Sequence, residues 1–266
     1  MDKKHLLLVL GNTIGVIATI IVNALAVILP LNGKSTNELS DALPNLFVPS
    51  GITFSIWSVI YIFLIIFMIY QIYGLIAKQK SDLRYLEKIG IWFMVASFAN
   101  VLWIFLWHYQ YVTISLVAMV ILLLSLMIMY LKLNIGLSES SNREKLTVNT
   151  TVSIYFGWIT VATIANVTAV LVNLDVGELV LGEEIWTMIV IVVATIITVL
   201  IILQRRDIPY SLVIIWALLG IVIKRLADDP IYGIQTRIAT TAAIAIVVVL
   251  ITLIIKFVPN KRKSVN

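Results

Sequence analysis

Long apolar runs separated by short polar stretches dominate this chain. Most of the runs approach the roughly 20 residues that an α-helix needs to cross a hydrocarbon layer of about 30 Å. The pattern therefore predicts eight transmembrane helices, at residues 5–31, 54–77, 89–109, 111–133, 150–173, 185–203, 210–223 and 234–257. The turn around Gln110 is so short that the third and fourth spans must form an antiparallel hairpin.

The composition agrees with this pattern, because 61% of the 266 residues are hydrophobic and only 12% are charged. A soluble globule of this size has too little interior to hide so much apolar surface. We therefore predict an all-α, polytopic membrane protein with the lipid bilayer as its surroundings. The chain has no cysteine, which excludes disulfides and thiolate metal sites. His5 and His108 lie on different spans, so a bis-histidine haem is disfavoured and no cofactor is required.

The basic residues indicate the orientation of the spans. If the amino terminus is cytoplasmic, 15 of the 19 lysines and arginines fall on the cytoplasmic side. A miscounted helix would spoil this asymmetry, so the positive-inside rule supports eight spans with both termini in the cytoplasm of a plasma-membrane protein. The rule also explains the net charge of +5 without a nucleic-acid partner.

Prolines and acidic residues avoid the middle of the predicted spans. Many ion-coupled transporters use broken helices and carboxylates buried in the membrane. Coupled ion transport is therefore disfavoured.

Aromatic and amide residues recur on three spans. At the start of the second span, Trp57 and Tyr61 are four residues apart and share one helical face. On the third span, Ala96, Asn100, Trp103 and Trp107 form one stripe by the same spacing. Because a buried amide or indole N–H needs a hydrogen-bond partner, this stripe should face protein. The alternative is that Asn100 bonds a neighbouring helix and the indoles anchor the membrane interface.

The fifth span repeats this combination with Trp158, Ala162 and Asn166. Small residues on this span would also let another helix approach closely, which is the packing alternative. Two spans that each combine a Trp, a small residue and an Asn on one face favour a shared pocket. Indole faces stack on planar ligands, and a few amides orient such a ligand in an apolar cavity.

These residues resemble the motifs of the tryptophan-rich sensory protein family, TspO/MBR, which includes the mitochondrial translocator protein, also called the peripheral benzodiazepine receptor. The motifs are Pro49, Phe54, Trp57 and Tyr61, then Asn100-x-x-Trp103-x-x-x-Trp107, then Trp158-x-x-x-Ala162-Thr-x-x-Asn166. They divide the chain into a TspO-like five-helix core at residues 1–173 and, at residues 174–266, three additional transmembrane helices with a basic cytoplasmic tail.

The resemblance implies a pocket that binds porphyrins and related tetrapyrroles, cholesterol-like lipids or synthetic aromatic compounds. Family members are often dimeric, so it also implies a homodimer. By the same resemblance, the ligand-binding residues are Trp57, Tyr61, Asn100, Trp103, Trp107, Trp158, Ala162 and Asn166.

Three functions are consistent with this pattern: a receptor or sensor for a flat apolar ligand, a transporter of such ligands, and a porphyrin-degrading enzyme. We favour the receptor, since no set of catalytic acids, bases or metal ligands falls at membrane depth. A charged segment after the seventh span holds Lys224, Arg225, Asp228 and Asp229, with i, i+4 pairs if the helix continues. It fits an anion site for propionate or phosphate groups, or else basic side chains that snorkel to the interface. His108 at a helix end is interpreted as interfacial.

Overall fold

The computed structural model describes residues 3–29, 31–77, 83–174 and 182–257, and these residues form helices and connections without a strand. The long helices are α1 (Lys3–Ile28), α3 (Ile56–Ile76), α5 (Trp92–His108), α6 (Val112–Leu133), α8 (Thr150–Asn173), α9 (Gly182–Arg205), α10 (Ile208–Leu226) and α11 (Thr236–Phe257). Within the described residues, seven helices are long and apolar enough to cross a membrane, and α5 is a shorter apolar helix. The predicted all-α, multi-span architecture is therefore confirmed.

Several segments predicted as loops contain helix. Between α1 and α3 lie η1 (Leu31–Gly33), α2 (Thr36–Asp41) and η2 (Gly51–Ser55). The helix α2 begins with a capping box, in which the Ser35 side chain accepts from the Glu38 backbone N–H and the Glu38 carboxylate accepts in return. We call residues 31–55 the cap segment.

The fifth span also begins earlier than predicted. Ser141 caps α7 (Asn142–Glu144), and the π-helical segment η4 (Lys145–Asn149) continues from it into α8. The predicted loop at residues 134–149 is therefore shortened from its carboxyl end. A further short helix, α4 (Arg84–Ile89), joins α5 through Gly90, which has a left-handed φ of 57°. The charged residues of three predicted connecting or terminal segments lie outside the described part of the chain, namely Lys78, Lys80, Asp175, Glu178 and residues 261–263.

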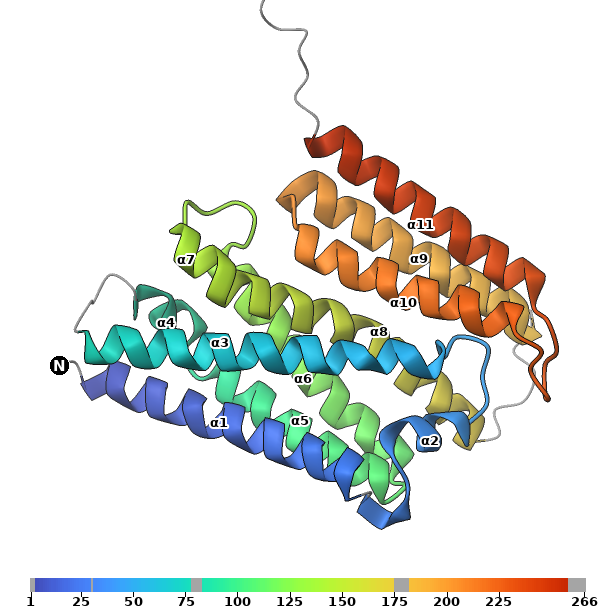
Figure 1. The fold of residues 1–266 in the computed structure, drawn as a ribbon, viewed down its shortest axis with the longest axis horizontal. Helices are drawn as coiled ribbons and strands as arrows, with labels where there is room; N and C mark the ends of the chain where they lie inside the picture. The colour runs from blue at the N-terminus through green and yellow to red at the C-terminus, as the bar shows by residue number, and fades with distance from the viewer. Residues whose placement is uncertain (1–2, 30, 78–82, 175–181, 258–266) are drawn as a thin grey trace, which may run out of the picture.

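The helix α8 lies at the centre of the molecule, with α3 and α6 on one side and α10 on the other (Figure 1). On the α6 side, α5 packs between α1 and α6, and on the other side α9, α10 and α11 form a three-helix group (Figure 1). Gly157 lets α10 approach, since a Cβ at this position would lie 3.2 Å from the Val213 Cβ. The group of three helices therefore attaches to the five-helix core through α10.

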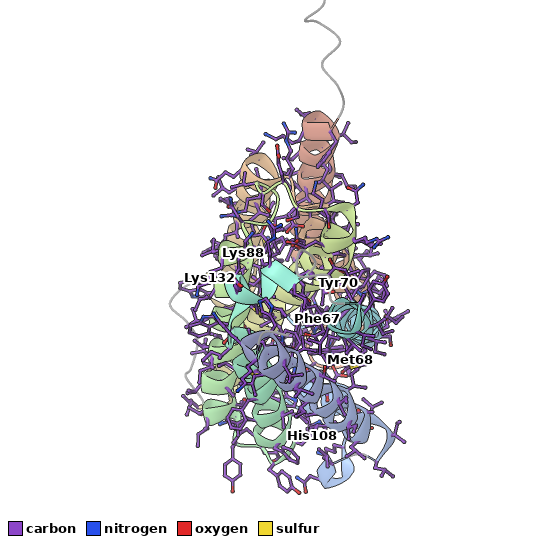
Figure 2. All side chains as sticks on the ribbon, turned by 90° about the vertical axis from the view of Figure 1, so that its left-hand side faces the viewer. Phe67, Met68, Tyr70, Lys88, His108 and Lys132 are labelled. Atoms are coloured by element: carbon purple, nitrogen blue, oxygen red, sulfur yellow. The ribbon has the colours of Figure 1, made fainter. Side chains whose placement is uncertain are left out.

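Figure 2 shows the bundle from the end at which the amino terminus lies, with Lys88 of α4 and Lys132 of α6. At this end the ring of Phe67 on α3 lies 6.1 Å from Tyr85 and 4.8 Å from Phe93, so aromatic side chains join α3, α4 and α5. His5 near the start of α1 contacts Glu87 of α4, whereas His108 at the end of α5 contacts the Leu31 carbonyl oxygen beyond the other end of α1. The two histidines therefore lie at opposite ends of the bundle.

At the same end, the connection between α9 and α10 carries a buried carboxylate. Asp207 accepts from the Ser153 hydroxyl of α8 at 2.7 Å and, as the N-cap of α10, from the Tyr210 backbone N–H at 3.1 Å. The neighbouring Arg205 donates to the Ile135 carbonyl oxygen at 3.2 Å and lies over the Tyr130 ring. These contacts fix the three-helix group to the core at a second place.

Candidate functional site

A cavity of about 40 Å³ lies beneath the cap segment, between α3, α5 and α8. Indoles and small apolar residues make up most of its wall. We call it the tryptophan pocket, and it is lined by Thr36, Ser40, Val48, Pro49, Phe54, Trp57, Trp103, Trp107, Trp158, Val161, Ala162, Ala165 and Asn166. Four of the chain's seven tryptophans therefore converge on one hollow.

The α5 wall is formed by Trp103 and Trp107, whose rings stack at 5.9 Å with an interplanar angle of 23°. The Trp103 indole N–H donates to the Asn166 side-chain oxygen at 3.0 Å. The Asn166 amide in turn donates to the Ser115 hydroxyl at 3.2 Å. These buried polar groups satisfy one another, so the Trp103 ring is held in place without facing lipid.

The opposite wall is an aromatic cluster from η2, α3 and α8. The Trp158 ring meets Phe54 edge-on at 5.9 Å and Trp57 at 6.3 Å. Ala162 and Ala165 follow on α8, and their small side chains leave the space that the pocket occupies. The Trp158 indole N–H is buried and has no hydrogen-bond partner among the described residues. An acceptor atom of a ligand would provide one.

The cap segment lies over the pocket and is tied to the end of α5. The Trp107 indole N–H donates to the Thr36 carbonyl oxygen at 3.4 Å. His108 is fully buried, with Nε2 3.0 Å from the Thr36 hydroxyl and Nδ1 3.1 Å from the Leu31 carbonyl oxygen. His108 therefore fastens η1 and α2 over the pocket, and its position at the membrane interface stays a prediction.

The helix α10 holds the other end of the cap segment. The Trp216 indole N–H donates to the Thr53 carbonyl oxygen, and the Ser50 backbone N–H donates to the Gly220 carbonyl oxygen, both at 3.0 Å. Glycine is needed at position 220, because a Cβ there would lie 1.9 Å from the Thr53 hydroxyl and 2.9 Å from the Pro49 Cβ. The three-helix group thus reaches the pocket indirectly, by positioning its cover.

Six of the eight predicted site residues line the pocket, and two do not. Trp57, Trp103, Trp107, Trp158, Ala162 and Asn166 are in the wall. Tyr61 lies behind it and stacks on Trp57 at 5.7 Å. Asn100 is fully buried and accepts from the Asn23 amide at 2.7 Å. The prediction that Asn100 lines the pocket is corrected in favour of the helix-bonding alternative, because α1 supplies its partner.

Sequence reasoning missed the residues that fasten the cap. A Ser-x-x-Glu capping box at Ser35 and Glu38 was a detectable sign of the helix α2. Asn23 on α1 was also detectable, since an amide inside an apolar span needs a buried partner. No local pattern pointed to Trp216 or Gly220, whose partners are more than 160 residues away.

The charged segment after the seventh span is arranged differently from the prediction. The helix α10 ends at Leu226, and Lys224 forms an ion pair with Asp41 at 2.7 Å instead of with Asp228. The predicted pair of Arg225 and Asp229 is present at 3.7 Å. Arg225 is only 1% exposed, so it does not snorkel into the interface.

A family model described as TSPO-like protein matches residues 8–255 of this chain. The matched region covers the five-helix core and continues through α9, α10 and most of α11. No curated protein and no solved structure matches the chain.

Proposed function

Because this chain belongs to the TSPO-like protein family, we propose that it is a membrane receptor that binds a flat apolar ligand in the tryptophan pocket. A porphyrin or another tetrapyrrole is the ligand class that the family resemblance favours. The observation that carries the proposal is the convergence of Trp57, Trp103, Trp107 and Trp158, from three helices, on one hollow under a fastened cap.

The chemistry of the wall supports a planar, mostly apolar ligand. The indole faces offer stacking surface, and edge-to-face partners fix their orientation. The polar groups at the pocket are few, namely the Asn166 amide, the Trp158 indole N–H and the hydroxyls of Thr36 and Ser40. A ligand site of this kind is typically apolar with a small number of orienting polar groups.

The pocket is small in this structure. A volume of about 40 Å³ is far below the ~300–1,000 Å³ of typical small-molecule sites. The proposal therefore requires the cap segment to move away from α5 and α10 when a ligand binds. The hydrogen bonds of Trp107 and Trp216 to the cap backbone are the contacts that such a movement would break.

Titration of the full-length protein in detergent micelles with protoporphyrin IX tests the proposal. We expect saturable quenching of tryptophan fluorescence, because four of the seven indoles line the pocket. An Ala162→Leu variant should weaken binding at least tenfold, since it fills a pocket that already holds little space. Ala243→Leu on the exposed face of α11 adds the same atoms elsewhere and serves as the control. Equal affinities for both variants and the unaltered protein would refute the proposed site.

Binding and breakdown are separated by following the pigment over time. With a receptor, the absorption of the bound porphyrin stays constant over time, whereas a degrading enzyme removes it. If the protein is such an enzyme, Trp103→Phe and Trp158→Phe variants would slow that loss. Flux of porphyrin into vesicles that contain the protein would indicate the transporter instead.

A plasma-membrane location, cytoplasmic termini and a homodimer belong to the same proposal. Labelling of single introduced cysteines from either side of the membrane tests the orientation, since the chain has none of its own.

A further inference from the structure

A second, larger cavity lies beside the tryptophan pocket, at the end of the bundle covered by the cap segment. Its volume is about 210 Å³, and Ser40 and Val48 line both cavities. The cap segment supplies Asp41 and Pro44, whereas α10 and the connection to α11 supply Lys224, Arg225, Asp229 and Tyr232. We call this cavity the arginine chamber.

Arg225 is the residue that gives the chamber its chemistry. Its side chain is 1% exposed, and its guanidinium lies 5.8 Å from the centre of the Tyr232 ring. The Nε and Nη1 atoms are buried and have no hydrogen-bond partner among the described residues. A buried donor without an acceptor is costly, and more so when it is charged. An oxygen-bearing group in the chamber would satisfy these donors.

The acidic residues of the chamber are already engaged. Asp41 pairs with Lys224 at 2.7 Å. The Asp229 Oδ1 atom accepts from the backbone N–H groups of Ile231 at 2.9 Å and Tyr232 at 3.1 Å. Its other oxygen is 3.7 Å from Arg225 Nη2, which is too far for a strong hydrogen bond. Partial burial raises the pKa of Asp229, but these amides and the neighbouring cations leave that pKa below its ordinary value, so Asp229 stays ionised at neutral pH.

Among the described residues that line the chamber, the buried polar atoms without a hydrogen-bond partner are therefore the Nε and Nη1 donors of Arg225. The Tyr232 hydroxyl donates to the Pro44 carbonyl oxygen at 3.2 Å and so links the two sides of the chamber. A planar guanidinium binds carboxylate and phosphate oxygens particularly well, because its donors match their geometry. The tryptophan pocket next to it offers almost only apolar surface. The two cavities together match a molecule with a flat apolar body and an anionic end.

We propose that the arginine chamber binds the anionic end, a carboxylate or phosphate group, of an amphipathic ligand whose apolar body occupies the tryptophan pocket. This inference rests on the proposed function, because it assigns the second half of the same ligand. It also gives the three-helix group a direct part in recognition, since α10 supplies Arg225.

The experiment compares protoporphyrin IX, which has two carboxylates, with its uncharged dimethyl ester in the same micelles. The unaltered protein should bind the acid about tenfold more tightly than the ester, as expected for a hydrogen bond to a charged group. Arg225→Gln should abolish this preference while it leaves the affinity for the ester unchanged. Arg225→Lys keeps a positive charge and should restore part of the preference.

Arg237→Gln is the matched control, because it removes one positive charge from an exposed side chain near the same end of the bundle. It should leave the preference for the acid intact. Inorganic phosphate alone distinguishes a free anion from the end of a larger ligand. The inference would be overturned in favour of a separate anion site by two results together. Inorganic phosphate would raise the thermal stability of the unaltered protein but not that of Arg225→Gln, and the unaltered protein would bind acid and ester with equal affinity.

The other outcomes are also decisive. Equal affinities of the unaltered protein for acid and ester, without an effect of phosphate, would overturn the inference and leave the tryptophan pocket standing. Failure of both porphyrins to bind the unaltered protein would instead refute the proposed function. If Arg225→Gln does not fold, the comparison of acid and ester on the unaltered protein and on Arg225→Lys still decides the matter.

Discussion

The asparagines of α5 and α8 have different tasks, although their sequence surroundings are alike. Asn166 contacts the pocket and fixes Trp103, whereas Asn100 pairs with Asn23 and joins α5 to α1. Both amides are buried, and each would lose its partner in an apolar environment if the other member of its pair were removed. Pocket chemistry and helix association are therefore separable by substitution.

The first prediction concerns Asn100. Replacement Asn100→Leu leaves the Asn23 amide without its acceptor on α5, so we expect a loss of about 1–2 kcal/mol in stability. The double variant Asn23→Leu with Asn100→Leu should regain part of the loss, because both partners are then apolar. Fluorescence-detected thermal unfolding measures the stability. Porphyrin affinity should change less than stability in both variants, and a selective loss of affinity would show that Asn100 acts in the pocket.

The second prediction concerns Asp207. Burial raises its pKa above the ordinary value of 3.8, while bonds from Ser153 and the Tyr210 backbone and the charge of Arg205 oppose the rise. In the window above pH 3.8 the folded protein therefore holds a proton that the unfolded chain has released. Stability must fall as pH rises through this window and level off above the folded-state pKa.

The variant Asp207→Asn tests this by removing the ionisation. Asparagine keeps an acceptor for the Tyr210 N–H and offers a donor to Ser153, so the variant should be at least as stable as the unaltered protein at pH 7. The stability difference between the two proteins should grow from pH 4 upward. Asp207→Ala should lose about 0.5–2 kcal/mol at any pH, since it removes the N-cap of α10. Stability curves that run parallel with pH for the unaltered protein and Asp207→Asn would contradict a raised pKa of Asp207 in the folded protein.

At the scale of elements, α10 packs against α8 of the core and also supports the cap segment. Gly157 of α8 lets it pack against the core, and Gly220 lets η2 and Pro49 pack against it. The length and position of α10 were predictable from the apolar run, because helix formation in a membrane depends on local hydropathy. Its contacts with the cap were not, because they depend on how helices far apart in sequence are packed.

The third prediction addresses this contact. Replacement Gly220→Ala places a Cβ 1.9 Å from the Thr53 hydroxyl, so η2 must shift away from α10. Overpacking of this kind typically costs about 1–3 kcal/mol. The pair Thr53→Ala with Gly220→Ala removes the closest clash and should recover part of the stability. Thermal unfolding of the three variants checks this, and unchanged stability of Gly220→Ala would mean that the cap does not rest on α10.

Much of the site was predictable at this scale. The spacing predicted that Trp103 and Trp107 share one face and that Trp158, Ala162 and Asn166 share another, because helical periodicity determines which side chains lie together. All five line the same cavity, while their role in ligand binding stays a prediction. The short helix α2 and the early start of the fifth span were missed, because capping by Ser35 and Ser141 outweighs the polar character of those segments.

For the molecule as a whole, the central fact is that the pocket lies within the five-helix core, whereas the cap segment over it is held by both helix groups. The cap is held by α5 through Trp107 and by α10 through Trp216 and Gly220. The sequence did not show that both helix groups hold the cap segment, since this depends on the packing of α10 on α8. Under the proposed function, ligand access would depend on the release of the cap, and the contacts of α10 help to hold the cap in place.

The fourth prediction tests this dependence. A Cβ at position 220 would lie 3.0 Å from the Thr53 Cβ and 2.9 Å from the Pro49 Cβ. A shift of η2 and Pro49 by about half an ångström away from α10 would relieve both contacts and bring cysteines at 53 and 220 to the usual disulfide spacing of ~3.5–4.5 Å. The chain has no other cysteine that would compete. In the Thr53→Cys, Gly220→Cys variant, oxidation should slow porphyrin association at least tenfold, and reduction should restore it. Stopped-flow quenching measures the rate, with Thr53→Cys alone as the control. Equal association rates before and after oxidation would show that the ligand reaches the pocket by a route that leaves the cap closed on α10.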